Sequence, residues 1–417
     1  MAMALSGAAA GDEDRESSMP ICSRDDAERY VAMVCFKHGP PRRVGVELEW
    51  TVHHADDPTR PIEPADLQRA LGAYAPPTLA PDSPHLPLPS GSALTVEPGG
   101  QVEISPPPQQ SVATLLASVD ADIAALTALL APDDLVLGEH GSDAHRPPRR
   151  ILEVARYAAM QDAFDALGPA GSQMMCSTAA LQVCLDAGEA EAAAARWTAL
   201  HTIGPALVAL FANSRRLAGR DTGWASSRVR STFGTCPPQT GPPALDGDPA
   251  HRWAALAMEA PVICLRRDGA SWHAPPGLTF GAWADGALGL RPTFDDLDYH
   301  LSTLFPPVRP RGYLEVRYLD SQPADRWRDP VLLLTALMAD PATVDAAIDA
   351  AERAADRWIP AARQGLDDEP VLEAASGLVE LGCAAMAGLD VDAAQVAHTT
   401  DYLQRRIDGH SMRRHSA

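Results

Sequence analysis

Two glutamates stand side by side in the stretch VGVELEW, residues 44–50. Glu47 and Glu49 alternate there with apolar residues. Successive side chains of a strand leave on opposite faces, so we expect both glutamates on one face and an apolar surface on the other. Two such charges about 4 Å apart repel by roughly 4 kcal/mol at an effective dielectric constant near 20. The pair therefore implies screening by water, protonation of one acid, or a cation between them.

A second stretch, ALTVEPGGQVEIS at residues 93–105, combines the same alternation with a turn. Glu103 stands between Val102 and Ile104, and Glu97 directly precedes a Pro-Gly-Gly sequence. Glycine permits positive φ and a close approach of the backbone, which suits a strand that bends around a ligand. This stretch adds two carboxylates to the expected polar face.

Two later stretches extend the pattern to four strands. Each alternates apolar with polar residues, so each presents its polar side chains on one face. These side chains are Thr178 and Gln182 in TAALQVCLD, and Glu315 and Arg317 in YLEVRYLD. Hard cations such as Mg²⁺ take oxygen ligands, usually one or two carboxylates for each ion together with phosphate and water. The five glutamates could hold two or three such ions, and a plain solvated face is the alternative.

Arginines supply the opposite charge. Arg228 and Arg230 lie two residues apart in WASSRVRSTFG, residues 224–234, which we expect to be extended with both side chains on one side. Arg156 lies in the helical patch EVARYAAM. Arginine binds carboxylate or phosphate through two parallel hydrogen bonds. In a chain of net charge −21 this set favours an anionic ligand, and ordinary surface salt bridges are the alternative.

The composition restricts the class of protein. The chain has 417 residues, of which 46% are hydrophobic, and its negative charge disfavours nucleic acid and anionic membranes as partners. No apolar run reaches the roughly 18 residues of a membrane span. Seven cysteines without a CxxC pair, and a start without a basic leader, predict a reduced, cytoplasmic protein. The chain lacks the GxxxxGK[ST], GxGxxG and HExxH motifs, so nucleotide binding would depend on carboxylate-held Mg²⁺ and arginine.

The elements that position these residues follow from periodicity and turn signals. We expect a disordered tail at 1–23, a catalytic core at 24–328, and a helical region packed on that core at 329–417. Strands and helices in mixed order predict an α+β fold, with helices on one face of an antiparallel sheet. Helices are expected at 24–38, at 111–130 with Ser111 as N-cap, and from 187 to 214 with a break at Gly204–Pro205.

Several longer motifs resemble one known family. They are VGVELEW, EPGGQVEIS, ARYAAM, MMCSTAALQV, LFANS, LTF at 278–280, and HLSTLFPPVRPRGYLEVR. In this order they resemble the glutamate–cysteine ligases of the plant and proteobacterial type, and more closely the actinobacterial members of the ergothioneine pathway. The resemblance covers about residues 36–325.

The resemblance implies a fold similar to glutamine synthetase and the guanidino kinases, in which a curved, mostly antiparallel sheet forms a funnel with helices on the outside. It also implies a reaction. ATP phosphorylates the γ-carboxylate of L-glutamate with the help of Mg²⁺, and the amine of L-cysteine then displaces phosphate to give γ-glutamylcysteine. The alternatives are another amine acceptor, a phosphotransferase of the guanidino-kinase type, or a non-catalytic nucleotide-binding module. We expect a monomer.

Residue roles also follow from the resemblance. The implied metal ligands are Glu47, Glu49, Glu97, Glu103 and Glu315. The implied catalytic residues are Arg228 and Arg317, and the implied substrate-binding residues are Arg156, Tyr157, Thr178, Gln182, Arg228 and Arg230. The chain departs from the family in two places, with Cys184 in place of asparagine and Gln239–Thr240–Gly241 in place of Arg-Thr-Gly. The second departure puts the nucleotide contacts of that loop in doubt.

Overall fold

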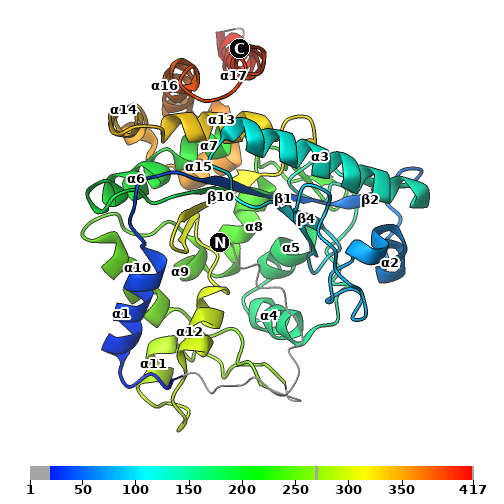
Figure 1. Ribbon diagram of the computed structural model, residues 1–417, viewed down its shortest axis with the longest axis vertical. Helices are drawn as coiled ribbons and strands as arrows, with labels where there is room; N and C mark the ends of the chain where they lie inside the picture. The colour runs from blue at the N-terminus through cyan, green and yellow to red at the C-terminus, as the bar shows by residue number, and fades with distance from the viewer. Residues whose placement is uncertain (1–18, 268–270, 416–417) are drawn as a thin grey trace.

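A six-stranded antiparallel sheet lies at the centre of the molecule (Figure 1). The structure is a computed structural model that describes residues 19–267 and 271–415, so most of the expected tail at 1–23 lies outside the described residues. The strands follow the order β3–β4–β1–β6–β10–β9. Their bounds are β1 Val44–Trp50, β3 Ala93–Val96, β4 Val102–Ser105, β6 Ala180–Leu185, β9 Val308–Pro310 and β10 Leu314–Asp320. The predicted α+β class with an antiparallel sheet is confirmed.

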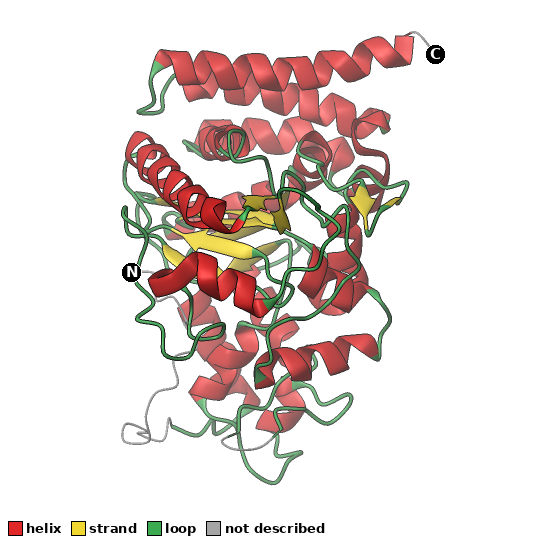
Figure 2. Cartoon of the chain, turned by 90° about the vertical axis from the view of Figure 1, so that its right-hand side faces the viewer, coloured by secondary structure: helices red, strands yellow, loops and turns green. Residues whose placement is uncertain are grey.

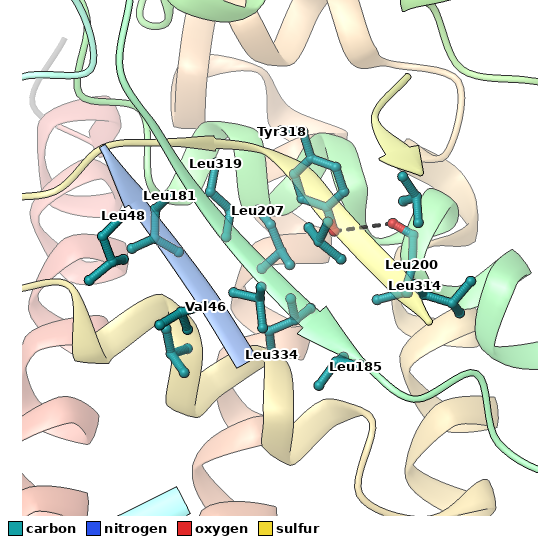
Figure 3. Packing of buried hydrophobic residues seen from close by; sticks show 14 of the residues in the cluster. Val46, Leu48, Leu181, Leu185, Leu200, Leu207, Leu314, Tyr318, Leu319 and Leu334 are labelled. Carbon is teal, nitrogen blue, oxygen red and sulfur yellow. Dashed lines mark hydrogen bonds between the residues drawn. The ribbon is translucent and has the colours of Figure 1, made fainter. Parts of the chain in front are cut away.

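One face of the sheet is apolar and packs against helices. Figure 3 shows Leu48, Leu181 and Leu319 of the sheet in one cluster with Leu207 of α7 and Leu334 of α13. Every second side chain of each strand points toward these helices. The alternation seen in the sequence therefore gives the sheet one apolar and one polar face. The helices of this layer are α3 Val112–Leu130, α6 Ala190–Thr202, α7 Gly204–Leu210 and α13 Arg328–Leu337.

Helix α3 follows its predicted pattern. Ser111 accepts a hydrogen bond from the backbone N–H of Thr114 at 3.1 Å, as an N-cap should. Seven apolar residues of the expected stripe are buried, namely Val112, Leu115, Leu116, Val119, Ile123, Leu126 and Leu130. Asp122 is also buried, and its carboxylate accepts the N–H groups of Ser90 and Ser92 at 2.7 and 3.0 Å. The helix is therefore tied to the loop before β3 as well as to the sheet.

One apolar segment is longer than the sequence pattern suggested. Val112–Asp133, which includes α3, is long and apolar enough by length and composition to cross a membrane, with a mean hydropathy of 1.6. A bent pair, Arg328–Leu337 with Pro341–Ala354, passes the same test jointly at an angle of 107°. The expectation that no segment has this length was therefore wrong. Because Val112–Asp133 packs one face on β1 and buries Asp122 in hydrogen bonds, it has the contacts of a core helix.

The C-terminal helices continue the layer on the apolar side of the sheet. In Figure 2 the helix that ends at the C-terminus lies at the top, and other helices lie between it and the sheet. Residues from Ile21 to Leu403 nevertheless belong to one hydrophobic cluster, so the helical region shares its core with the sheet. The boundary at 328/329 stays a prediction. The helices are α14 Pro341–Ala351, α15 Trp358–Gln364, α16 Glu369–Met386 and α17 Ala393–His415.

A second layer of helices faces the polar side of the sheet (Figure 1). The expectation of helices on one face only was therefore wrong. A strand whose polar side chains serve a ligand still needs a wall opposite them, and these helices provide it. They are α1 Arg24–Cys35, α4 Ala155–Asp165, α5 Ala170–Ser177, α8 Ser227–Thr235, α9 Pro237–Thr240, α10 Pro249–Glu259, α11 Phe280–Ala284 and α12 Phe294–Leu301.

Smaller elements complete the described chain. Helix α2, Pro64–Leu71, packs against α3. Two short antiparallel pairs lie outside the main sheet. They are β2 Val52–His54 with β5 Leu135–Leu137, and β7 Arg216–Leu217 with β8 Arg220–Asp221.

The shared core makes a stability prediction. Leu334 is fully buried between α13 and the sheet, so Leu334→Ala should lower the free energy of unfolding by about 2–5 kcal/mol. Leu290 is 68% exposed, so Leu290→Ala should change the free energy of unfolding by less than about 0.5 kcal/mol. Urea unfolding followed by circular dichroism measures both. Equal effects of the two substitutions, or a separate early transition in Leu334→Ala, would contradict a common core.

Candidate active site

The strand register arranges the polar side chains in rows across the sheet. Residues that face each other on neighbouring antiparallel strands have Cβ atoms about 5 Å apart, so each row is a line of near neighbours. The first row holds Arg309, Glu315 and Cys184, the second holds Gln182 and Glu47, and the third holds Glu49, Glu103 and Thr95. The four strands predicted from alternation thus bring their polar side chains together.

A β-bulge places Arg317 in this array. The register of β10 against β6 shifts between Val316 and Leu319, so two residues of β10 stand opposite Gln182. The Arg317 guanidinium donates to Gln182 Oε1 and, at 2.8 Å, to Glu315 Oε2. Gln182 Nε2 in turn donates to Glu49 Oε1 at 3.1 Å. Gln182 therefore links an arginine on one side to a carboxylate on the other.

A cavity of about 1910 Å³ lies between the polar face and the second helix layer. Most of the residues singled out in the sequence line it, although they come from six separate elements and the segments between them. They are Glu47, Glu49, Glu97, Glu103, Arg156, Tyr157, Thr178, Gln182, Arg228 and Arg317. The structure thus brings these candidates to one place.

Four of the acids resist ionisation in this cavity. Burial, followed by the charges of Glu315 and Glu103, raises the pKa of Glu47 to about 8. Burial and the charge of Glu49 raise the pKa of Glu103 to about 7, and burial also raises the pKa values of Glu49 and Glu97. Burial and mutual repulsion therefore outweigh the nearby arginine charges, and shifts of this kind are typical of carboxylates at functional sites. Oxygen donors in this arrangement suit hard divalent cations.

Glu315 behaves differently from the other four acids. Its side chain is fully buried and contacts three guanidiniums, from Arg309 at 2.7 Å, Arg317 at 2.8 Å and Arg311 at 3.4 Å. Burial alone would raise the pKa of Glu315, but the three arginines lower it far below its usual range. Glu315 still has a ligand oxygen within 4.8 Å of ligand atoms of Glu47 and Cys184. Its metal-binding role stays a prediction, and holding the arginines is a further role.

Arg309 and Arg311 were missed by the sequence analysis. Both line the cavity. They lie in VRPR, where the polar positions do alternate, but Pro310 and the shortness of β9 hid the strand. A basic, alternating stretch just before a strand that carries Glu315 was the available signal.

Arg228 is held at the cavity by a network below it. Ser226 caps α8 by accepting the N–H of Val229 at 3.1 Å, and the Arg228 N–H donates to Ser214 Oγ at 3.1 Å. Both serine hydroxyls donate to the buried carboxylate of Asp320, at 2.8 Å from Ser226 and 2.7 Å from Ser214. The Arg228 guanidinium itself donates to the carbonyl of Arg317. Asp320 therefore fixes the start of α8 and, through it, the position of Arg228.

The expected extended segment at 224–234 is wrong, because α8 begins at Ser227. Residues two apart on a helix point about 200° apart, so Arg228 and Arg230 cannot share a side. Arg228 is buried in the cavity wall, whereas Arg230 is exposed, with its guanidinium 5.3 Å from the ring centroid of Trp224. Arg230 is not among the lining residues. The N-cap serine was the signal for a helix that the sequence analysis overlooked.

Arg156 and Tyr157 stand on the helical wall opposite the acids. The Arg156 guanidinium donates to the hydroxyl and the carbonyl of Ser302, each at 3.1 Å, and lies 5.0 Å from the ring centroid of Tyr299. Burial, followed by the charge of Glu97, raises the pKa of Tyr157 above its usual range. The charge of Arg156 partly offsets the rise in the pKa of Glu97. This end of the cavity therefore combines a fixed guanidinium with aromatic rings.

The two departures from the family pattern have different positions. Gln239 and Thr240 are buried in the short helix α9, where the side chain of Gln239 donates to the carbonyl of Pro261 at 2.9 Å. Neither lines the cavity. Cys184 does line it, beside Glu47 and Glu315, and burial keeps the pKa of its thiol well above the usual value. Of the two, only Cys184 can meet a ligand directly in this arrangement.

The fold and the matched sequence define the class of protein. Residues 43–404 match the sequence model of glutamate–cysteine ligase family 2 (GCS2), and the chain belongs to this family. The predicted membership, and an enzyme of the glutamate–cysteine ligase type, are confirmed.

Particular relatives refine this placement. The glutamate–cysteine ligase EgtA of Mycolicibacterium smegmatis is 40% identical over 384 residues, covering 88% of this chain and 86% of the relative. EgtA of Mycobacterium tuberculosis is 40% identical over 389 residues, covering 90% and 87%. The chloroplastic glutamate–cysteine ligase of Brassica juncea is more distant, at 28% identity over 285 residues, covering 66% of this chain and 54% of its own length. The predicted similarity to the actinobacterial members is confirmed.

A solved structure supports the fold. The glutamate–cysteine ligase of Francisella tularensis, determined in complex with AMP, superimposes with a TM-score of 0.50 at 14% identity. The match covers 89% of this chain and 83% of that chain. At this identity the similarity concerns the fold alone.

The Asp320 network makes a prediction for Arg228. Asp320→Asn keeps the size of the side chain but replaces one acceptor oxygen, so one of the serines that hold α8 loses its partner. A shift of about 1 Å at Arg228 should lower kcat on the order of 10²-fold. Asp325→Asn, at a side chain 77% exposed, is the matched control. Kinetics beside circular dichroism separate this effect from unfolding, and an unchanged kcat in a folded Asp320→Asn protein would refute it.

The crowded acids predict a pH-dependent response to Mg²⁺. Glu47 and Glu103 have raised pKa values, so between about pH 4.5 and 8 the folded chain keeps protons that the unfolded chain has lost. Without metal, stability should therefore fall as pH rises through this window. A cation that replaces the protons should raise the melting temperature more at about pH 8.5 than at about pH 6. Differential scanning fluorimetry with sodium chloride of equal ionic strength as control measures this, and a larger effect at low pH would contradict it.

Proposed function

We propose that the protein joins the γ-carboxylate of L-glutamate to the amine of L-cysteine with ATP and Mg²⁺, giving γ-glutamylcysteine, ADP and phosphate. The observation that carries the proposal is one cavity lined by three glutamates of the sheet, by Glu97 of the turn after β3, and by Arg228 and Arg317. Membership of the glutamate–cysteine ligase family and 40% identity to the two EgtA proteins support the choice of substrates. They also support a place as the first step of ergothioneine formation.

The acids fit the cations that this reaction needs. Glu47, Glu49, Glu97 and Glu103 offer oxygen ligands alone, and burial, followed for three of them by the charge of a neighbouring glutamate, raises their pKa values. In the proposal they hold Mg²⁺, with Glu315 as a fifth ligand near Glu47. Bound Mg²⁺ would neutralise the charge of the phosphates and of the substrate carboxylate.

The arginines carry the electrostatic part of the mechanism. Phosphoryl transfer needs little covalent help from a protein, because holding the reactants in line and neutralising developing charge supply most of the catalysis. Arg228 and Arg317 lie next to each other and face the acids, so in the proposal they neutralise the phosphoryl group as it moves from ATP to glutamate. Their fixed hydrogen bonds mean that little reorganisation is needed during the step.

Arg156 and Tyr157 bind an amino-acid substrate in this proposal. The Arg156 guanidinium is fixed by Ser302 and can still bind a carboxylate, and the adjacent rings exclude water. The amine of cysteine attacks the carboxyl carbon (Cδ) of γ-glutamyl phosphate, and the bond between this carbon and the phosphate oxygen breaks, so that phosphate and one amine proton are released. Thr178 and Gln182 complete the polar floor, and Gln182 keeps Arg317 and Glu49 apart.

Product analysis tests the proposal against its alternatives. Incubation with Mg-ATP, glutamate and cysteine should release ADP and phosphate only when both amino acids are present. A ligase with another acceptor would use the same acids and arginines, so cysteine must outperform alanine and other amines in a panel of acceptors. A phosphotransferase would yield a stable phosphorylated product without free phosphate. ADP release that needs neither amino acid would refute the proposed reaction.

Removing one acid should show its contribution. Glu47→Gln keeps the shape but removes the charge that a cation would bind, and should lower kcat on the order of 10²-fold or more. Arg228→Ala should cause a loss of similar size. Glu191→Gln, at an exposed position of α6 outside the cavity, is the control and should leave the rate unchanged. Steady-state ADP release measures all three, and Glu47→Gln activity near that of the wild type would contradict the metal-binding role.

A further inference from the structure

One end of the cavity carries an excess of positive charge. The start of β1, the end of β6 and the start of β10 lie side by side there, because Val44 pairs with Leu185 and Leu185 with Leu314. Glu315 and Asp186 are carboxylates at this end, and Glu47 borders it beside Glu315. Asp186 accepts the backbone N–H groups of residues 42 and 43. The cations that line the cavity around them are Lys37, Arg43, Arg309, Arg311 and Arg317.

Glu315 cannot neutralise the arginines around it. It carries one negative charge and contacts the guanidiniums of Arg309, Arg311 and Arg317. Two of these have further partners, since Arg309 also donates to the carbonyl of Leu304 at 3.3 Å and Arg317 donates to Gln182. The cluster is therefore positively charged and its members are held in place. Arranging like charges in this way is costly unless an anion binds among them.

Among the three arginines around Glu315, Arg311 makes the fewest hydrogen bonds to the described residues of the protein. Within the described residues, the only hydrogen bond of its guanidinium is the 3.4 Å contact with Glu315, which is longer than the other two. Its side chain is 32% exposed and lines the cavity. A guanidinium has five N–H donors in a planar fork, so most of those of Arg311 are available to a ligand.

We propose that Arg311, supported by Arg309, binds the phosphate chain of a nucleoside triphosphate. The inference rests on the proposed function, because ATP carries the most negative charge of the three proposed substrates. Glu47 lies beside this end and Glu49, Glu103 and Glu97 lie beyond it, so the charge of the cavity changes sign along the sheet. A triphosphate bound at the arginines extends toward the acids, where the cations are bound. The amino acids then occupy the acidic and aromatic end.

Nucleotide binding tests this assignment without turnover. Affinities for ATP, ADP and AMP are measured by calorimetry with Mg²⁺ present and both amino acids omitted. The variants are Arg311→Gln, which removes the charge, and Arg311→Lys, which keeps the charge but not the planar fork. Arg353→Gln is the matched control, because it makes the same change in net charge at a side chain 77% exposed on the far helical region.

The expected result is a selective loss of phosphate recognition. Arg311→Gln should weaken ATP binding about tenfold or more, as expected for a hydrogen bond between charged groups, and AMP binding less than about twofold. Arg311→Lys should fall between Arg311→Gln and the wild type, and Arg353→Gln should bind all three nucleotides normally. Melting temperatures near that of the wild type show that the variants are folded.

Other results would overturn the assignment. Unchanged ATP affinity in Arg311→Gln, or equal weakening of ATP and AMP, would show that Arg311 does not contact the phosphate chain. A raised KM for glutamate or cysteine with normal ATP affinity would make the cluster a carboxylate site instead. The proposed function is judged separately by the products of the wild type. If the wild type makes γ-glutamylcysteine but Arg311→Gln binds nucleotides normally, only the inference is refuted. If Arg311→Gln selectively loses ATP affinity but the wild type does not make γ-glutamylcysteine, only the proposed function is refuted.

Discussion

Negative charge crowded on one buried surface is the constraint that organises this structure. Three glutamates on one face of the sheet and Glu97 in the turn after β3 line one cavity, and burial is the main cause that raises the pKa of Glu47 to about 8. Such a face is stable only where opposite charge meets it, and the chain provides that charge in two ways. Fixed arginines surround Glu315, while the acids that line the cavity would hold Mg²⁺ in the proposed reaction. In the proposed reaction, a complex of Mg²⁺ with the phosphates of ATP would neutralise these acids.

Packing on the apolar side of the sheet fixes the positions of the side chains on the polar side. Helices α3, α7 and α13 bury one face of every central strand, so the strands cannot slip in register without exposing their core residues. Register in turn sets which acid stands beside which arginine. Asp320 extends this control to α8, because its carboxylate holds two serines whose positions determine that of Arg228. Binding groups on strands and on a helix are thus fixed by one core.

Alternation in the sequence predicted the strands β1, β6 and β10 and their polar faces, because a period of two depends only on local geometry. It predicted a single bent strand at 93–105, where the Pro-Gly-Gly turn in fact separates two paired strands, β3 and β4. It could not reveal the bulge at Arg317, which arises from pairing with β6. It also gave the wrong conformation for 224–234, where a capping serine begins a helix and separates Arg228 from Arg230. Asp320 and Arg311 escaped notice for a related reason. Their importance lies in contacts with residues distant in the chain, which no local pattern records.

The thiol in the cavity wall has a consequence of its own. An enzyme that handles cysteine is exposed to cystine and other oxidised thiols, and an ionised cysteine near the substrate would be open to disulfide exchange with them. Burial, followed by the charges of Glu47 and Glu315, keeps Cys184 in its neutral form. Since only the thiolate is a strong nucleophile, burial leaves this sulfur chemically quiet. A neutral, buried thiol can therefore lie in the cavity wall without entering disulfide exchange with oxidised thiols.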